Sequence, residues 1–178
     1  MKEDAAQTPW NKYIHLSERL EIPAKTVLLR EGHVATHTYY LERGCVRIWF
    51  NHAGKDITLD FFLEGEGVSS IESFRTGRPS DFYLESLEPC ILYRIAKKDF
   101  EFMLGDAPAF RKRIEDLTFQ TLFRYQQLFL SRIKNSPEER YRELLHTRPE
   151  LLQRIPQHYI ASYLGMTPVS LSRIRNKR

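Results

Sequence analysis

The chain has 178 residues, of which 42% are hydrophobic and 28% charged, and its formal net charge is +4; these values are typical of a globular protein with one or two small domains. No apolar run approaches the roughly 20 residues that span a membrane, and the polar start of the chain lacks the apolar core of a secretory signal, so we expect a cytoplasmic location and no membrane partner. The two cysteines, Cys45 and Cys90, have no metal-binding spacing and lie in apolar runs, which predicts buried thiols and no metal site.

The N-terminal half of the chain is predicted to contain a short helix followed by many short strands. The helix is expected over residues 10–20, and the β-rich region extends from residue 22 to about 95. Runs rich in β-branched and aromatic residues alternate there with glycine-containing turn signals. These runs cover residues 27–29, 39–41, 46–50, 57–62, 82–84 and 91–93. Short strands at regular spacing predict a β-sandwich or a barrel.

Residues 97–134 are predicted to be helical, with Asp106 capping the longer part and Pro108 in its first turn. This longer part has two apolar stripes, whereas a surface helix needs only one. The first stripe consists of Phe110, Ile114, Leu117 and Thr121, and the second of Phe119, Leu122, Phe123, Gln126, Phe129, Leu130 and Ile133. We expect one stripe to pack on the β domain and the other on a second copy of the helix, which gives a homodimer. The alternative is a helix buried on most sides within its own chain.

A domain boundary is predicted near Asn135, because a new helix begins at once. Ser136 and Glu139 have the spacing of a capping box, and Pro137 fits the first turn. A further short helix is expected to begin at Pro149 and to end near residue 155.

Residues 157–177 have the pattern of a helix-turn-helix. Ala161 is small enough for two steeply crossing helices to touch there, and Gly165 can adopt the positive φ that the turn requires. Thr167 can cap the second helix, with Pro168 in its first turn. The apolar positions that would bury the pair are Ile160, Leu164, Met166, Leu171 and Ile174. The alternative is a small helical hairpin that binds only protein.

The outward face of the second helix predicts contact with double-stranded DNA. Short polar and basic side chains near a helix N-terminus suit the major groove, and Arg173 is the candidate for a contact to guanine. The residues predicted to contact DNA are Gln157, Thr167, Val169, Ser170, Ser172, Arg173, Arg175 and Lys177. Residues 132–178 hold ten Lys and Arg against four Asp and Glu, whereas the rest of the chain holds 17 against 19. This asymmetry also favours a polyanionic partner at the C-terminal end.

Residues 22–178 resemble the Crp/Fnr family of bacterial regulators. The segments 22–32 and 39–48 are similar to the opening strands of that family, and Leu63-Glu-Gly-Glu-Gly67 is similar to the turn before its ligand cassette. The resemblance implies an α+β fold with a β-roll (jelly-roll) sensor domain over residues 1–106, a dimerisation helix over 107–135 and a helix-turn-helix domain over 136–178. It also implies that the family's base-reading arginine falls on Arg173.

The sequence departs from this family in its ligand cassette. Cyclic-nucleotide binders of the family carry Gly-Glu-Leu and, about ten residues later, Arg followed by Ser or Thr. This chain has Ser69-Ser70-Ile71 and Pro79-Ser80-Asp81 at those places, so we do not expect cAMP binding. The residues expected to face another, unidentified small effector are Glu66, Val68, Ser69, Ser70, Arg78 and Ser80. The family's β-hairpin wing is also expected to be missing, because the sequence ends at Arg178.

These patterns together predict a sequence-specific, homodimeric, DNA-binding transcription regulator, with RNA polymerase as a candidate partner. Nucleophile-elbow, Walker and zinc-protease motifs do not occur, so no enzyme activity, catalytic residue or cofactor is expected. The alternative function is a regulatory module that binds a cyclic nucleotide or another small ligand and docks on a partner protein.

Overall fold

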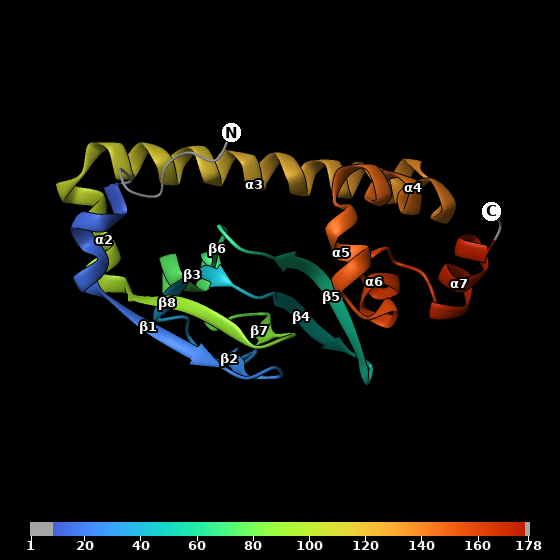
Figure 1. Ribbon diagram of the computed structural model, residues 1–178, viewed down its shortest axis with the longest axis horizontal. Helices are drawn as coiled ribbons and strands as arrows, with labels where there is room; N and C mark the ends of the chain where they lie inside the picture. The colour runs from blue at the N-terminus through green and yellow to red at the C-terminus, as the bar shows by residue number, and fades with distance from the viewer. Residues whose placement is uncertain (1–8, 177–178) are drawn as a thin grey trace. The chain divides into compact units, whose positions relative to one another are not determined.

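The computed structural model describes residues 9–176 of the chain (Figure 1). The chain forms two compact units, each built from two separate segments. The first unit contains the chain up to residue 48 together with residues 61–119, and the second contains residues 49–60 together with the chain from residue 120 onward.

The first half of the chain forms mainly strands and the second half mainly helices, in the order that the sequence predicts. The elements up to the middle of the chain are η2 (Pro9–Leu16, a 3₁₀ helix), β1 (Ser17–Ile22), β2 (Val27–Leu29), β3 (His37–Arg43), β4 (Val46–His52), β5 (Lys55–Phe62), β6 (Gly67–Val68), α1 (Ile71–Thr76), β7 (Tyr83–Ser86) and β8 (Cys90–Ala96). The helices that follow are α2 (Lys97–Asp106), α3 (Pro108–Lys134), α4 (Pro137–Thr147), α5 (Pro149–Arg154), α6 (Gln157–Tyr163) and α7 (Pro168–Asn176).

The strands form two four-stranded sheets, in the orders β1-β8-β3-β6 and β2-β7-β4-β5. The central strand β8 pairs antiparallel with both β1 and β3, so that Leu92 lies opposite Leu20 on one side and Leu41 on the other. Leu41, Leu92 and Phe61 are completely buried. The alternation of apolar and polar residues along these strands therefore directs one side of each into a common core.

Gly44 illustrates how tightly this core is closed. Its φ of +105° is one that L side chains rarely adopt, and a Cβ placed on it would lie 2.9 Å from the carbonyl oxygen of Pro89. Both cysteines are buried as the sequence predicts, and the Cys90 thiol lies next to Gly44 and donates to the carbonyl oxygen of Cys45 at 3.5 Å.

The predicted helix over residues 10–20 is only partly correct. A 3₁₀ helix ends at Leu16, and residues 17–22 form strand β1 instead. Leu20 and Ile22 are half-buried while their neighbours are exposed, and the strand pairs with β8 over its full length. Pairing along the edge of an existing sheet outweighs the helical tendency of so short a segment.

The predicted cap of the long helix is wrong. Asp106 is the last residue of α2, and its carboxylate accepts hydrogen bonds from the Lys12 ammonium at 2.8 Å and from the Tyr13 hydroxyl at 2.7 Å. These two donors, the ammonium first, hold the pKa of Asp106 below its usual value. The carboxylate therefore ties η2 to the helical region, and Pro108 begins α3 without it.

A cluster of aromatic rings anchors α2 and the first turns of α3 within the first unit. Phe100 packs edge-on against Phe74 and against Phe110, with ring centroids 5.6 and 5.8 Å apart. Phe110 and Met103 are buried together with Tyr13, and Ile114 packs against them. The first apolar stripe of α3 thus begins in the core of this unit, as the sequence predicts.

In the second unit, α3 continues without a break to Lys134, and α4 begins three residues later at Pro137 (Figure 1). The Ser136 hydroxyl accepts from the backbone N–H of Glu139, and the Glu139 carboxylate accepts from the N–H of Ser136 at 2.7 Å. The predicted capping box is therefore present, and α5 begins at Pro149 as expected.

Candidate nucleic-acid interface

The helices α6 and α7 form a helix-turn-helix whose core matches the predicted positions. Ile160, Ala161 and Leu171 are 1%, 0% and 1% exposed, so the first helix contacts the second through its smallest side chain. Gly165 has a φ of +66°, and its N–H donates to the carbonyl oxygen of Ser162 at 3.0 Å. The turn thus requires a residue that tolerates this conformation, and glycine does.

Two arginines from outside the motif hold its turn. The Arg132 guanidinium, near the end of α3, donates to the carbonyl oxygen of Tyr163 at 2.6 Å, and Arg140 of α4 donates to that of Leu164 at 2.9 Å. Cations at a helix C-terminus satisfy its last carbonyl groups and oppose the helix dipole. Partial burial, followed by the nearby charge of Arg140, lowers the pKa of Arg132. The sequence offered no signal for these contacts beyond the basic charge of the region.

The start of α7 is capped as predicted. The Thr167 hydroxyl accepts from the backbone N–H of Ser170 at 3.1 Å and lies 2.9 Å from the Ser170 hydroxyl. Ser170 is half-buried, so this hydroxyl pair lies at the edge of the helix face rather than at its centre. Thr167 and Ser170 thereby define the end of α7 at which a phosphate could be received.

One exposed face runs along α7. Val169, Ser172, Arg173 and Asn176 have the spacing of residues that lie above one another on a helix, and all are exposed. Val169 is 60% exposed and is the apolar member of this face. Leu171 lies on the opposite, buried side of the helix.

The remaining predicted contact residues lie around this face. Arg175 is exposed but stands outside the spacing of the four, on the flank of α7, and Gln157 is exposed at the first position of α6. Lys177 lies outside the described residues. The sequence holds no Asp or Glu between residues 151 and 178, whereas it holds five basic residues there. This last part of the sequence therefore carries a positive net charge.

The tip of the β4–β5 hairpin belongs to the same compact unit as this motif and is fastened to α6. The Ser162 hydroxyl accepts from the backbone N–H of Thr58 at 2.9 Å and donates to the carbonyl oxygen of Asp56 at 3.1 Å. One serine of the first motif helix thus completes the hydrogen bonding of an edge strand.

A buried carboxylate strengthens this attachment. Asp60 of β5 is completely buried, and its two oxygens lie 2.9 Å from the Arg124 guanidinium of α3 and 3.3 Å from that of Arg148, between α4 and α5. Burial, followed by the negative charge of Asp60, raises the pKa of Tyr163 to about 12 and that of Tyr125 as well. The role of Asp60 could not be predicted from local sequence patterns, because its partners Arg124 and Arg148 lie 64 and 88 positions away.

In the first unit, two of the predicted effector residues of the ligand cassette, Ser70 and Ser80, contact each other. The Ser80 hydroxyl lies 2.8 Å from that of Ser70, and each of these residues is 3% exposed. Ser80 also accepts from the backbone N–H of Phe82 at 3.1 Å. Cyclic-nucleotide binders of the resembled family carry Glu and Arg in these two stretches. In this chain a contact between two serine hydroxyls is found there instead.

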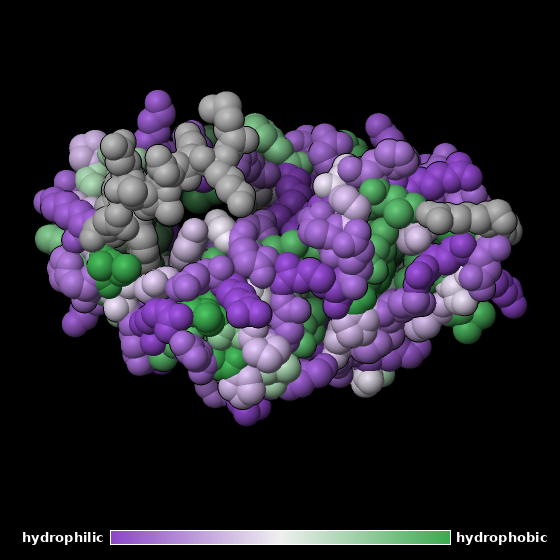
Figure 2. Space-filling model, in the orientation of Figure 1, coloured by the Kyte–Doolittle hydropathy of each residue, from purple (hydrophilic) through white to green (hydrophobic). Residues whose placement is uncertain are grey.

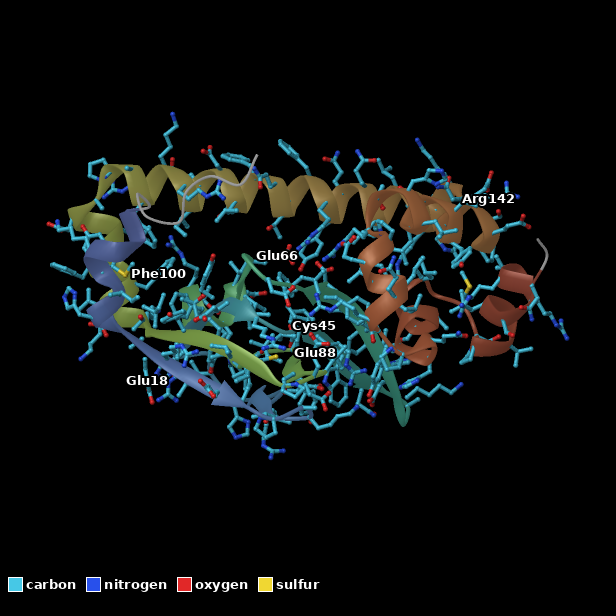
Figure 3. The ribbon with its side chains drawn as sticks, viewed as in Figure 1. Glu18, Cys45, Glu66, Glu88, Phe100 and Arg142 are labelled. Carbon is cyan, nitrogen blue, oxygen red and sulfur yellow. The ribbon has the colours of Figure 1, made fainter. Side chains whose placement is uncertain are left out.

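The other predicted effector residues bond to other parts of the chain, are buried, or lie at the surface. Ser69 donates to the carbonyl oxygen of His37 at 3.3 Å, and the Glu66 carboxylate (Figure 3) accepts from the N–H of Leu63 at 2.7 Å within the turn before β6. Val68 is buried opposite Tyr39. The side chain of Arg78 is 77% exposed and lies 3.8 Å from Glu72. This arrangement does not fit a cyclic phosphate, because a buried phosphate needs a paired cation.

The second apolar stripe of α3 is exposed. Its large members Phe119, Leu122, Phe123, Phe129 and Ile133 are 57%, 57%, 58%, 65% and 66% exposed. The face shown in Figure 2 is largely hydrophilic, with apolar residues in separate groups. An exposed apolar stripe of this length is unusual for a surface that remains in water.

Comparison with known proteins finds a family model that matches part of the chain. Residues 19–106 match the model of the cyclic nucleotide-binding domain. No curated protein matches the chain. Within the described residues, no helix is long and apolar enough to cross a membrane, and no group of three or more His, Cys, Asp or Glu comes together as a metal site.

Solved structures share the fold over nearly the whole chain. The c-di-GMP-responsive global regulator CLP of Xanthomonas campestris is 20% identical, with a TM-score of 0.75 over 94% of this chain and 88% of that one. A CooA variant of Carboxydothermus hydrogenoformans is 15% identical, with a TM-score of 0.77 over 96% and 80%. The catabolite activator protein of Thermus thermophilus is 19% identical, with a TM-score of 0.61 over 96% and 83%. The α+β fold expected from the resemblance is thus confirmed: residues 19–106 match the model of the cyclic nucleotide-binding domain, and the chain shares the fold of these three solved structures.

Proposed function

We propose that this protein is a sequence-specific transcription regulator that binds double-stranded DNA as a homodimer. The observation that carries the proposal is the exposed polar and basic face of α7, held by a complete helix-turn-helix core in a region without acidic residues. In solved complexes of this motif, the second helix enters the major groove.

The positions on α7 assign different roles to its side chains. Val169, Ser172 and Arg173 lie on the central face and would reach base edges, with Arg173 donating two hydrogen bonds to guanine. Arg175 on the flank and Gln157 at the start of α6 would contact phosphates, as would the hydroxyls at the α7 cap. Phosphate contacts set affinity and salt dependence, whereas base contacts set specificity.

The sensor unit supports regulation by a ligand other than a cyclic nucleotide. Ser70 and Ser80 contact each other where a phosphate would have to enter, and Arg78 lies outside on the surface. We infer that an effector would increase the population of conformations in which the two DNA-binding heads of the dimer are spaced for successive major grooves. RNA polymerase is a candidate partner of the DNA-bound dimer.

The proposal is tested by incubating the purified chain with a random pool of double-stranded DNA at moderate salt and sequencing the retained fraction. We expect an inverted repeat whose half-sites are about one helical turn, 10–10.5 base pairs, apart. Arg173→Ala should relax one base position in each half-site, by about 1–3 kcal/mol of discrimination. Arg113→Ala, at an exposed position of α3, is the matched control and should leave the selected sequence unchanged.

Other outcomes separate the alternatives. Retention without sequence preference, unaltered by Arg173→Ala, would contradict base reading by α7. An absence of retention at low salt, where phosphate contacts are strongest, would instead favour the docking of a partner protein.

A further inference from the structure

A cavity lies in the first unit beside the loop of residues 30–36. Its volume is about 310 Å³, at the lower end of the range of small-molecule sites. Strand β2, the loop of residues 30–36, the start of β3 and Leu84 of β7 line it. None of the predicted effector residues belongs to this lining.

The lining of the cavity combines buried apolar residues with basic residues. Leu84 and Tyr39 are 1% and 7% exposed, and Leu29 is half-buried. The Tyr39 hydroxyl donates to the carbonyl oxygen of Leu28 at 3.3 Å. Arg30 also lines the cavity and is exposed. A molecule that fills the cavity would therefore meet both apolar side chains and an arginine.

The charge of the cavity points to an anion with a single charge. Its described lining contains Arg30, His33 and His37 but no Asp or Glu. Burial, followed by the charge of Arg94, lowers the pKa of His37, which disfavours the charged form of this imidazole. Its Nδ1 lies 2.9 Å from the Thr36 hydroxyl. Arg30 therefore supplies the one permanent charge, which a carboxylate matches through two parallel hydrogen bonds.

The loop that forms the basic wall is bonded to the cassette. The N–H of Gly32 donates to the carbonyl oxygen of Ser80 at 2.7 Å, and the N–H of Ser80 donates to that of His33 at 2.9 Å. The N–H of Ala35 donates to the Ser73 hydroxyl at 2.8 Å. A ligand held by Arg30 thus contacts a loop whose backbone is part of the cassette, and its binding changes the surroundings of these amides.

We propose that this cavity binds a small organic monocarboxylate with an apolar body, its carboxylate on Arg30 and its hydrocarbon part against Leu29, Tyr39 and Leu84. The inference concerns ligand binding by the first unit and does not require that the protein bind DNA.

The test is a titration of the full chain, without DNA, with butanoate, hexanoate and hexanamide, followed by amide chemical shifts and by calorimetry. Hexanoate should bind saturably, about tenfold more tightly than butanoate, because each buried methylene contributes about threefold to fourfold. Hexanamide has the same shape without the charge and should bind at least tenfold more weakly. The shifts should concentrate at the amides of Gly32, Ala35 and Ser80.

Variants separate this site from adventitious binding. Arg30→Gln should weaken hexanoate binding at least tenfold and leave the weak binding of hexanamide unchanged. Arg43→Gln, an exposed arginine at the end of β3, should have no effect. Equal binding of hexanoate and hexanamide, an equal loss in the Arg43 variant, or no saturable binding at about 10 mM hexanoate would each overturn the proposal. Because no DNA is present, none of these outcomes depends on whether α7 reads a base sequence.

Discussion

Asp60 shows how a single residue can join parts of a chain that are distant in sequence. Removing a carboxylate from water is costly, and the cost is offset here by two guanidinium groups, which lie on opposite oxygens. The arginines keep 24% and 15% of their side chains exposed, so each shares its charge between Asp60 and water. The network therefore fixes β5, α3 and the junction between α4 and α5 in one arrangement.

Asp60→Asn preserves the shape of this side chain but removes its charge. We expect the free energy of unfolding to fall by about 3 kcal/mol, because two partly buried guanidinium groups then lack their common counter-charge. Urea denaturation followed by circular dichroism measures the change. Asp116→Asn, an exposed aspartate of α3, is the matched control and should change stability by less than about 0.5 kcal/mol. Equal effects of the two substitutions would contradict the role of Asp60.

At the scale of residues, the sequence predicted what local spacing determines and missed what tertiary contacts determine. The positive φ at Gly165 and the cap at Thr167 depend on neighbours within a few positions, and both were predicted. Asp106 is a common helix-capping residue and lies close to Pro108, but its carboxylate instead accepts hydrogen bonds from Lys12 and Tyr13. These donors lie 94 and 93 positions away in the sequence. The hydrogen bond of Arg132 to the turn of the motif could not be predicted, because its carbonyl partner lies 31 positions further along the chain.

At the scale of elements, α4 owes its start to a reciprocal cap. The backbone N–H of Glu139 donates to the Ser136 hydroxyl, and the Glu139 carboxylate accepts from the backbone N–H of Ser136. This backbone bond is the main cause that holds the pKa of Glu139 below its ordinary value. The helix carries Arg140, which holds the turn before α7, so the cap also supports the proposed DNA-binding face.

Ser136→Ala should lower the free energy of unfolding by about 1 kcal/mol. Because the pKa of Glu139 is lower in the folded chain, its contribution is present above the unfolded pKa near 4.5 and is lost as the pH falls through the folded value. Glu139→Gln should therefore destabilise the chain at pH 7 more than at pH 3, as measured by urea denaturation at both values. Ser172→Ala, an exposed serine within α7, should be close to neutral. A loss from Glu139→Gln that is equal at the two pH values would contradict this electrostatic account.

Among the elements, strands and long helices were predicted most closely. All six predicted runs coincide with strands, since alternation and turn residues are local signals. Strand β1 was missed because only its pairing with β8 selects the extended form. Helix α1 was not predicted either, since six residues are too few for a helical period to be recognised.

At the scale of the whole molecule, the second stripe of α3 predicts self-association. Phe129→Glu places a charge at a position that is 65% exposed in the single chain and that we expect to be buried in the dimer. Sedimentation at micromolar concentration should give twice the mass of one chain for the original protein and the mass of one chain for this variant. Gln127→Glu introduces the same charge at another exposed position of the helix and should leave the dimer intact. A single-chain mass for the original protein would refute the dimer.

The contact between Ser162 and the hairpin has a consequence for how the chain acquires its structure. Thr58 and Ser162 are 104 positions apart, and the unit to which both belong is assembled from two segments that the rest of the chain separates. Contacts of such long sequence separation have a high entropic cost of loop closure and form late in folding. During synthesis the hairpin is made before α6, so the hydrogen bonds to Ser162 can form only after α6 has also been synthesised. The arrangement of α6 in this unit therefore depends on a hairpin that has already formed correctly.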